Sequence, residues 1–122
     1  MLKGIHEVTY FVPDVHAALQ WLQSLTGAEL LLQSPDLIQA RIGPSLVTFH
    51  PADEKAPSGP GGQVAYWRVD DLESALAVFE ERGGHRYRRL VVGPDGLAVA
   101  QVQDPWGNVW GLIQAVQPKE VM

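Results

Sequence analysis

The pattern of apolar and polar residues predicts one structural unit that occurs twice along the chain. In the first copy, apolar residues at helical spacing follow Asp14, an N-cap residue, and stop at Gly27. In the second copy, the same spacing follows Asp70 or Asp71 and ends at Gly84. Asp71 lies 57 positions after Asp14, as Gly84 does after Gly27. A repeat of this kind predicts two modules of one design, fused head to tail.

Alternating apolar residues and turn signals place four strands in each module. The first module is predicted to have strands at 5–12, 28–33, 37–42 and 46–50, and the second at 64–69, 86–92, 97–103 and 109–116. The sequence therefore predicts an α+β fold with two βαβββ modules, at about 3–51 and 63–116, in one domain of 122 residues. A Pro- and Gly-rich linker at 52–62 joins them, and the tail from 117 is expected to be loose.

Composition and charge remove several classes of function. The formal net charge of −5 argues against a general nucleic-acid binder, which usually presents a basic face. The absence of cysteine excludes disulfides, thiolate nucleophiles and cysteine metal sites. No segment approaches the ~20 apolar residues of a membrane span, and the first residues lack the apolar run of a signal peptide. We therefore expect a cytoplasmic protein with no nucleic-acid or membrane partner.

Strand alternation gives each predicted sheet a face covered by its helix and an open face. Two such sheets side by side would enclose a cleft between their open faces, the default position for a ligand. Trp67 and Trp110 alternate toward the helix side and are expected in the core. The residues that alternation places in the cleft as candidates for ligand binding are Glu7, Thr9, Phe11, Tyr66, Arg68, Gln101 and Val109.

Several motifs in this order resemble the vicinal oxygen chelate superfamily, which includes glyoxalase I, bleomycin resistance proteins and extradiol dioxygenases. They are Val12-x-Asp14 before a helix ending at Gly27, its repeat at Val69-Asp70-Asp71, and Asp104-Pro105-x-Gly107-Asn108 before the last strand. The resemblance spans residues 5–114. It implies the glyoxalase/bleomycin resistance fold, a barrel-like mixed sheet with a cleft that holds a small molecule, often over a divalent metal. It also implies a homodimer.

The resemblance allows a residue-by-residue test for the metal ligands. In glyoxalase-like members, a His or Gln near the start of each module's first strand and a Glu on its last strand hold the ion. Here the corresponding positions carry Glu7 and Val64, and Thr48 and Gly111. The resemblance thus adds Thr48 and Gly111 to the predicted ligand-binding residues, together with His50, which alternation places on the same face as Thr48. A catalytic site needs about three protein ligands, so we expect no metal and no other cofactor. A site made from Glu7 and His50 is the alternative with a divalent metal.

These observations lead to a small-molecule-binding protein of the bleomycin resistance type, which sequesters a drug or metabolite and has lost most metal ligands. The alternative is a lyase, isomerase or dioxygenase that uses the same cleft, with or without metal. In that case Glu7 is the candidate base, although it could equally be a charge at the cleft mouth. Tyr66 and Arg68 have either a binding or a structural role. A third hypothesis is a structural or regulatory module whose own side chains fill the cleft.

Overall fold

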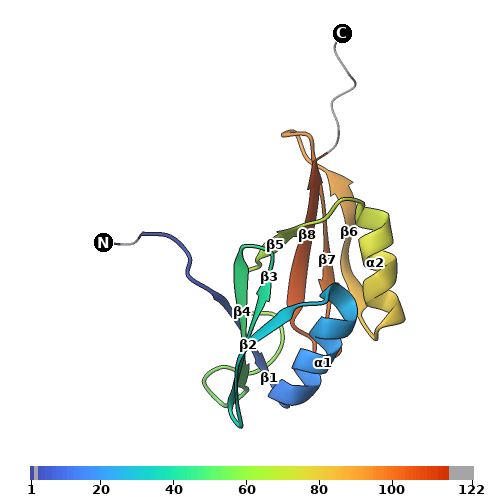
Figure 1. Cartoon of the computed structure of the whole chain (residues 1–122). Helices are drawn as coiled ribbons and strands as arrows, with labels where there is room; N and C mark the ends of the chain where they lie inside the picture. The colour runs from blue at the N-terminus through green and yellow to red at the C-terminus, as the bar shows by residue number, and fades with distance from the viewer. Residues whose placement is uncertain (2, 116–122) are drawn as a thin grey trace. The chain divides into compact units, whose positions relative to one another are not determined.

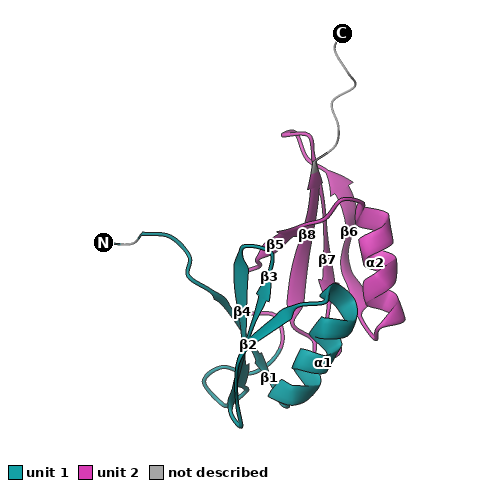
Figure 2. Ribbon diagram, viewed as in Figure 1, with its two compact units in different colours: residues 1–58 teal, residues 59–122 magenta. Residues whose placement is uncertain are grey.

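A computed structural model describes residues 1 and 3–115 of the chain, so the predicted loose tail from 117 lies outside the described residues. The chain divides into two compact units, Met1–Ser58 and Gly59–Met122, shown in teal and magenta in Figure 2. Their boundary falls inside the segment that the sequence predicts as a linker. Each unit has four strands and one helix in the predicted order (Figure 1).

Each unit forms its own four-stranded mixed sheet. Unit 1 contains β1 (Val8–Val12), α1 (Val15–Thr26), β2 (Glu29–Ser34), β3 (Leu37–Ile42) and β4 (Ser45–Pro51), with the strand order β1-β4-β3-β2. Unit 2 contains β5 (Tyr66–Arg68), α2 (Leu72–Glu81), β6 (His85–Val92), β7 (Leu97–Gln103) and β8 (Val109–Ala115), with the order β5-β8-β7-β6. In each sheet the first strand pairs with the last in parallel, and the other pairs are antiparallel.

Aspartate caps begin both helices, as the sequence predicts. The Oδ1 atom of Asp14 accepts hydrogen bonds from the backbone N–H groups of His16 and Ala17, at 3.0 and 3.1 Å. At α2 the cap is Asp71 rather than Asp70, and its Oδ1 accepts from Ser74 N at 3.4 Å. These carboxylates satisfy donors that the first helical turn leaves without a backbone partner.

The helices cover one face of each sheet and build a separate core in each unit. Residues of α1 lie against β3 and β4, and residues of α2 against β6, β7 and β8. Trp110 is 2% exposed and its ring centroid lies 5.7 Å from that of Trp67 and 6.2 Å from that of Phe79. The prediction that both tryptophans face the helix is therefore confirmed. The largest fully buried apolar side chains are Val12, Leu22, Ile38, Val47, Phe49, Leu72, Leu76, Val102, Trp110 and Leu112.

Two expectations need correction. In the described part of the chain the sheets are two separate four-stranded sheets and do not close into a barrel, because the strands of each module pair with one another. The first strand of each module is shorter than predicted, since it begins at Val8 and at Tyr66.

One further expectation, that the protein has no membrane-spanning segment, concerns the helices. Among the helices that the structure describes, none has the length and apolar character needed to cross a membrane.

Candidate functional site

The open face of unit 1 holds the carboxylate of Glu7 in a defined orientation. Its Oε2 atom accepts a hydrogen bond of 2.7 Å from Thr48 Oγ1 and one of 2.8 Å from Gln39 Nε2. Thr48 is 3% exposed and lies directly opposite Gln39 in the β3–β4 pair. Glu7 itself is half-buried. Both donors bind Oε2, and Oε1 has no hydrogen-bond partner within the described residues. Oε1 is therefore the carboxylate oxygen that a ligand could contact.

An aromatic pair lies on β1 and β4 of the same sheet. Phe11 of β1 is opposite His50 of β4, and their ring centroids are 5.2 Å apart. His50 Nδ1 is 2.9 Å from the carbonyl oxygen of Pro51, which can only accept, so we assign the proton to Nδ1. In the neutral ring this leaves Nε2 as an acceptor. Thr9 lies opposite Thr48 and is exposed.

The open face of unit 2 is organised by an aromatic ring that lies against a glycine. A β-carbon added to Gly111 would lie 2.6 Å from Cδ1 and 2.7 Å from Cγ of Tyr66, closer than real side chains approach. Gln101 Nε2 donates a hydrogen bond of 2.8 Å to the Tyr66 hydroxyl oxygen. Tyr66 is nevertheless 44% exposed. The backbone at Gly111 therefore supports one face of a ring that is still accessible.

The two open faces are built on corresponding positions. In unit 1, Thr9, Thr48 and Gln39 lie side by side across β1, β4 and β3. In unit 2, the same places across β5, β8 and β7 are taken by Tyr66, Gly111 and Gln101. Thr48 and Gly111 are thus topological equivalents, as the predicted register has them. The middle position carries a buried hydroxyl in one unit and a bare backbone under a tyrosine in the other.

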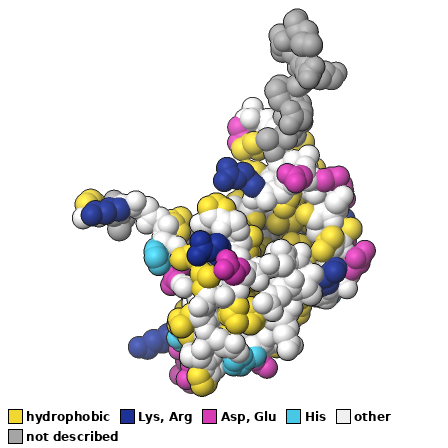
Figure 3. Space-filling model, in the orientation of Figure 1, with side chains coloured by type: hydrophobic (Ala, Val, Ile, Leu, Met, Phe, Trp, Pro, Cys, Tyr) yellow, Lys and Arg dark blue, Asp and Glu magenta, His cyan; other side chains and the backbone are white. Residues whose placement is uncertain are grey.

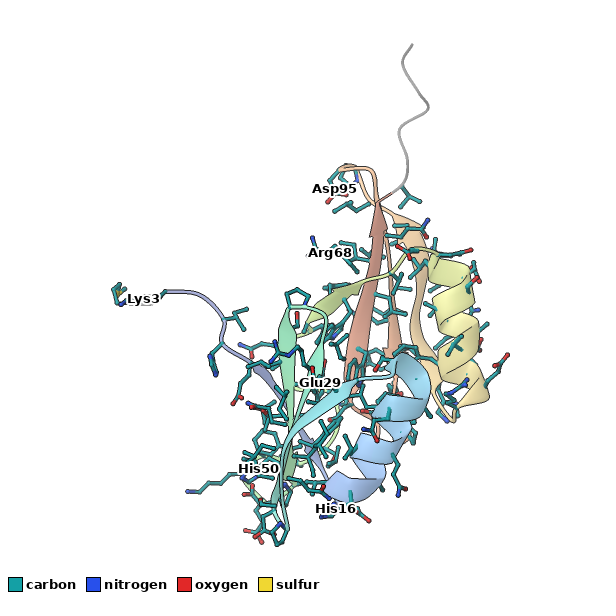
Figure 4. All side chains as sticks on the ribbon, in the orientation of Figure 1. Lys3, His16, Glu29, His50, Arg68 and Asp95 are labelled. Carbon is teal, nitrogen blue, oxygen red and sulfur yellow. The ribbon has the colours of Figure 1, made fainter. Side chains whose placement is uncertain are left out.

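Arg68 and Val109 complete the predicted set in unit 2. Arg68 lies two residues beyond Tyr66 on β5, opposite Ile113, and is exposed (labelled with His50 in Figure 4). Val109 is 8% exposed, so it packs within the unit and offers little contact surface. The structure therefore brings together Tyr66, Gly111 and Gln101 in unit 2, and Glu7, Thr9, Phe11, Thr48 and His50 in unit 1.

The Asp104–Asn108 segment, which carries part of the family resemblance, is a structural turn. Asp104 is 1% exposed, and its Oδ1 atom accepts from the backbone N–H groups of Trp106 and Asn108, each at 2.9 Å. Its Oδ2 atom accepts from Trp110 Nε1 at 3.0 Å. Burial raises the pKa of the Asp104 carboxyl above its ordinary value, and the N–H donors oppose this shift. The turn fixes the start of β8 and hence the position of Gly111.

The residues on the open faces do not fit the divalent metal that the resemblance implies. Val64 and Gly111 have no donor atom in their side chains, and the Thr48 hydroxyl already donates to Glu7. Among the described residues, no group of three or more His, Asp or Glu side chains is arranged to hold a metal ion. A three-ligand site of the usual catalytic kind cannot be assembled from this set.

Gln39 is the residue of the candidate site that sequence reasoning missed. Alternation along β3 places it on the open face, but only the pairing of β3 with β4 brings it to Thr48 and Glu7. The spacing that relates the first strand and helix of the two modules does not relate Gln39 to Gln101, because the β6–β7 hairpin is longer than the β2–β3 hairpin in its strands and in its turn. A comparison of the two β-hairpins, rather than one constant spacing, would have found the pair.

Comparison with solved structures finds proteins of similar fold over most of the chain. A glyoxalase/bleomycin resistance protein/dioxygenase family enzyme from Burkholderia phytofirmans PsJN superposes with a TM-score of 0.76 at 17% identity, covering 90% of this chain and 97% of that one. A lactoylglutathione lyase from Agrobacterium tumefaciens gives 0.70 at 20% identity and 98% coverage of both chains. TioX from Micromonospora sp. ML1 gives 0.69 at 23% identity, covering 92% of this chain and 99% of that one.

These structural likenesses show the fold. A search of curated proteins found no match. A family model, however, matches residues 4–112, which include both repeats, the Glu7 carboxylate and Gly111. The chain therefore belongs to the Glyoxalase/Bleomycin resistance protein/Dioxygenase superfamily.

Proposed function

We propose that this protein binds a small organic molecule on the open faces of its sheets without the aid of a metal ion, and so sequesters a drug or metabolite. The observation that carries the proposal is the contact between Tyr66 and Gly111. In glyoxalase-like relatives we expect a metal-binding Glu at this position, but here any side chain would collide with the ring. The place of a ligand-binding carboxylate is taken by an accessible aromatic surface.

The remaining residues of the open faces support binding of an organic molecule. Phe11 and His50 form a second aromatic surface in unit 1, and Tyr66 is fixed by Gln101 in unit 2. Aromatic rings combined with a few oriented polar groups are typical of small-molecule sites. Rings that are already held in place lose little conformational freedom on binding, which favours affinity.

Binding of a neutral aromatic probe tests the proposal. Naphthylethanol would be titrated into the protein while tryptophan fluorescence is followed, once with EDTA and once with added Zn²⁺ or Ni²⁺. We expect saturable binding of equal affinity in both, weakened by Tyr66→Leu or by Phe11→Leu. Tyr87→Leu is the matched control, because Tyr87 is 45% exposed but lies on the edge strand β6.

Each of the following results would overturn the proposal. One is a failure of the probe to bind, or binding that requires the metal. The other is about one equivalent of Ni, Zn, Fe or Mn in the purified protein by elemental mass spectrometry. Metal-dependent turnover of the hemithioacetal of methylglyoxal and glutathione would likewise show that a glyoxalase site forms.

A second candidate function is a metal-free lyase or isomerase in which Glu7 is the general base. The observation that favours it is the orientation of the carboxylate, whose Oε2 is held by Thr48 and Gln39 while Oε1 has no partner in the described chain. A base held in this way can accept a proton from a bound substrate. Turnover of a candidate substrate that survives Glu7→Gln would exclude this role.

We also propose that two copies associate through β2, the edge strand of the unit 1 sheet. Leu30, Leu31 and Leu32 are 38%, 37% and 48% exposed on this strand. Hydrophobic side chains at the surface are visible among charged groups on the face shown in Figure 3. An exposed apolar edge strand is a ready template for pairing with another chain. A cytoplasmic location stays a prediction from the sequence.

A further inference from the structure

We infer that the ligand carries a protonated amine or guanidinium group, which the Glu7 carboxylate binds, next to an aromatic ring that lies against Phe11 and His50. This inference rests on the proposed small-molecule binding and adds the chemical class of the ligand. It concerns unit 1, where Glu7 is held by two hydrogen bonds and Phe11 and His50 form an aromatic pair.

The first argument is the hydrogen bonding of Glu7. Thr48 and Gln39 both donate to Oε2, at 2.7 and 2.8 Å, so the carboxylate is fixed and Oε1 is left for a further donor. Both donors are neutral, and they orient the negative charge without neutralising it. A half-buried carboxylate with an unfilled oxygen is best satisfied by a charged N–H donor, since such hydrogen bonds are about twice as strong as neutral ones.

The second argument is that no cation of the described chain neutralises Glu7. None of its ion pairs includes this residue. Arg41 is the basic residue that alternation places on the same face as Gln39, and its Nε atom lies 3.7 Å from Glu29 Oε2. Buried or half-buried charges are usually paired, so the missing partner is a feature that a ligand can supply. The formal net charge of −5 also favours the approach of a cation.

The third argument is the position of the aromatic pair. His50 lies two residues beyond Thr48 on β4, a separation of roughly 7 Å along a strand. Phe11 lies beside His50, with 5.2 Å between the ring centroids. The oxygen of Glu7 calls for a donor rather than an acceptor on the ligand. The surface thus suits an aromatic ring joined to a cationic nitrogen by a short chain.

Three naphthalene probes that differ in charge test the inference. They are naphthylethylamine, which is protonated at neutral pH, naphthylethanol and naphthylacetate, all of one isomer. Dissociation constants would be measured by calorimetry at pH 7 for wild type, Glu7→Gln and Glu54→Gln. Gln retains the size of Glu7 and its capacity to accept from Thr48 and Gln39. Glu54→Gln is the matched control, because it removes the same charge at an exposed loop position.

We expect wild type to bind the ammonium probe about tenfold more tightly than the alcohol, and the carboxylate probe most weakly. In Glu7→Gln the ratio of the ammonium affinity to the alcohol affinity should fall to about one, and Glu54→Gln should keep the wild-type ratio of about ten. Equal affinities of wild type for the three probes, or an unchanged preference in Glu7→Gln, would overturn the inference. The preference is measured in the wild-type protein by itself, so the test does not depend on whether a variant folds.

Failure of the broader proposal would look different. If the alcohol does not bind at all, metal-free binding of aromatic molecules is wrong. If the alcohol binds but the ammonium has no advantage, only the inference about charge is wrong. A preference for naphthylacetate would assign recognition to a basic group such as the exposed Arg68 and would also overturn the inference.

Discussion

The ring of Tyr66 lies so close to the backbone of Gly111 that no β-carbon fits between them: an added one would be 2.6 Å from Cδ1. The two residues are directly opposite each other on the parallel strands β5 and β8. Gly111 does not have a positive φ, so it is required here by space and not by backbone conformation. This contact distinguishes unit 2 from unit 1, where Thr48 occupies the equivalent place.

Replacing Gly111 by Ala should therefore expel the Tyr66 ring and break its hydrogen bond to Gln101. We expect a loss of about 1–3 kcal/mol in the free energy of unfolding, the usual cost of overpacking. The same variant should bind naphthylethanol more weakly. Urea denaturation and the fluorescence titration measure the two effects.

A double-mutant cycle isolates the contact. In a Tyr66→Ala background, Gly111→Ala should change stability by less than about 0.5 kcal/mol, because the clash is gone. An equal cost in both backgrounds would show that Gly111 is needed for a reason other than the ring.

The caps of the two helices should differ in strength. Asp14 accepts from two backbone N–H groups at 3.0 and 3.1 Å, whereas Asp71 accepts from one at 3.4 Å. At α2, Gln114 Oε1 also accepts a hydrogen bond from Leu72 N at 2.7 Å, so Asp71 is not the only side chain that caps this helix. Asp14→Ala should cost about 0.5–2 kcal/mol, and Asp71→Ala less. Asp14→Asn, which still accepts, should recover most of the loss; no change at either position would mean that the caps are misassigned.

Asp104→Asn should destabilise unit 2 although the change is nearly isosteric. Both carboxylate oxygens of Asp104 accept from N–H groups, of Trp106, Asn108 and Trp110. In Asn the side-chain NH₂ group, a donor, replaces one of the two acceptor oxygens of Asp104. It would then face a protein N–H donor and leave a hydrogen bond unmade. A buried polar group without a partner costs about 1–3 kcal/mol. Thermal unfolding monitored by circular dichroism would measure it, and a midpoint equal to that of wild type would refute the role of the turn.

The same residue gives a dependence of stability on pH. Burial raises the pKa of Asp104 in the folded state, so the folded protein holds this proton more tightly than the unfolded chain. Its contribution to stability is then fully present below the unfolded pKa and is lost as pH rises through the folded pKa. The stability difference between wild type and Asp104→Asn should therefore be larger at pH 4 than at pH 7. Urea denaturation at both pH values measures it, and the opposite trend would refute the shift.

Association through β2 should respond to a single charge. Leu32→Lys places a cation on an exposed edge strand, a common means of preventing strand pairing. We expect light scattering at micromolar concentration to give a dimer for wild type and a monomer for the variant. The wild-type dimer should persist in 1 M salt, where exposed charges are screened over ~3 Å. A monomer mass for wild type would contradict the proposal.

Local patterns were sufficient to determine most of the fold. Helical spacing after Asp14 and Asp71 predicts both helices, because an apolar stripe and a capping carboxylate act within one turn. Turn residues predict the strands from 37 onwards to within a few positions. The first strands are shorter than expected, because pairing with β4 and β8, and not apolar pattern, sets where a strand begins. The cleft between the two modules stays a prediction.

In the candidate site, too, the sequence predicts some features and the tertiary structure decides others. Alternation along the strands assigns Glu7, Thr9, Phe11, Tyr66 and Gln101 to open faces, since successive side chains point to opposite sides. Only the tertiary structure decided which of them meet. The pairing of β3 with β4 brought Gln39 to Glu7, and the pairing of β5 with β8 set the Tyr66 ring on Gly111. Sequence reasoning interpreted Gly111 as a position where a metal ligand is missing. The structure shows that the Tyr66 ring occupies the space above Gly111. This contact depends on the register between strands that are distant in the sequence, which a single-strand pattern does not contain.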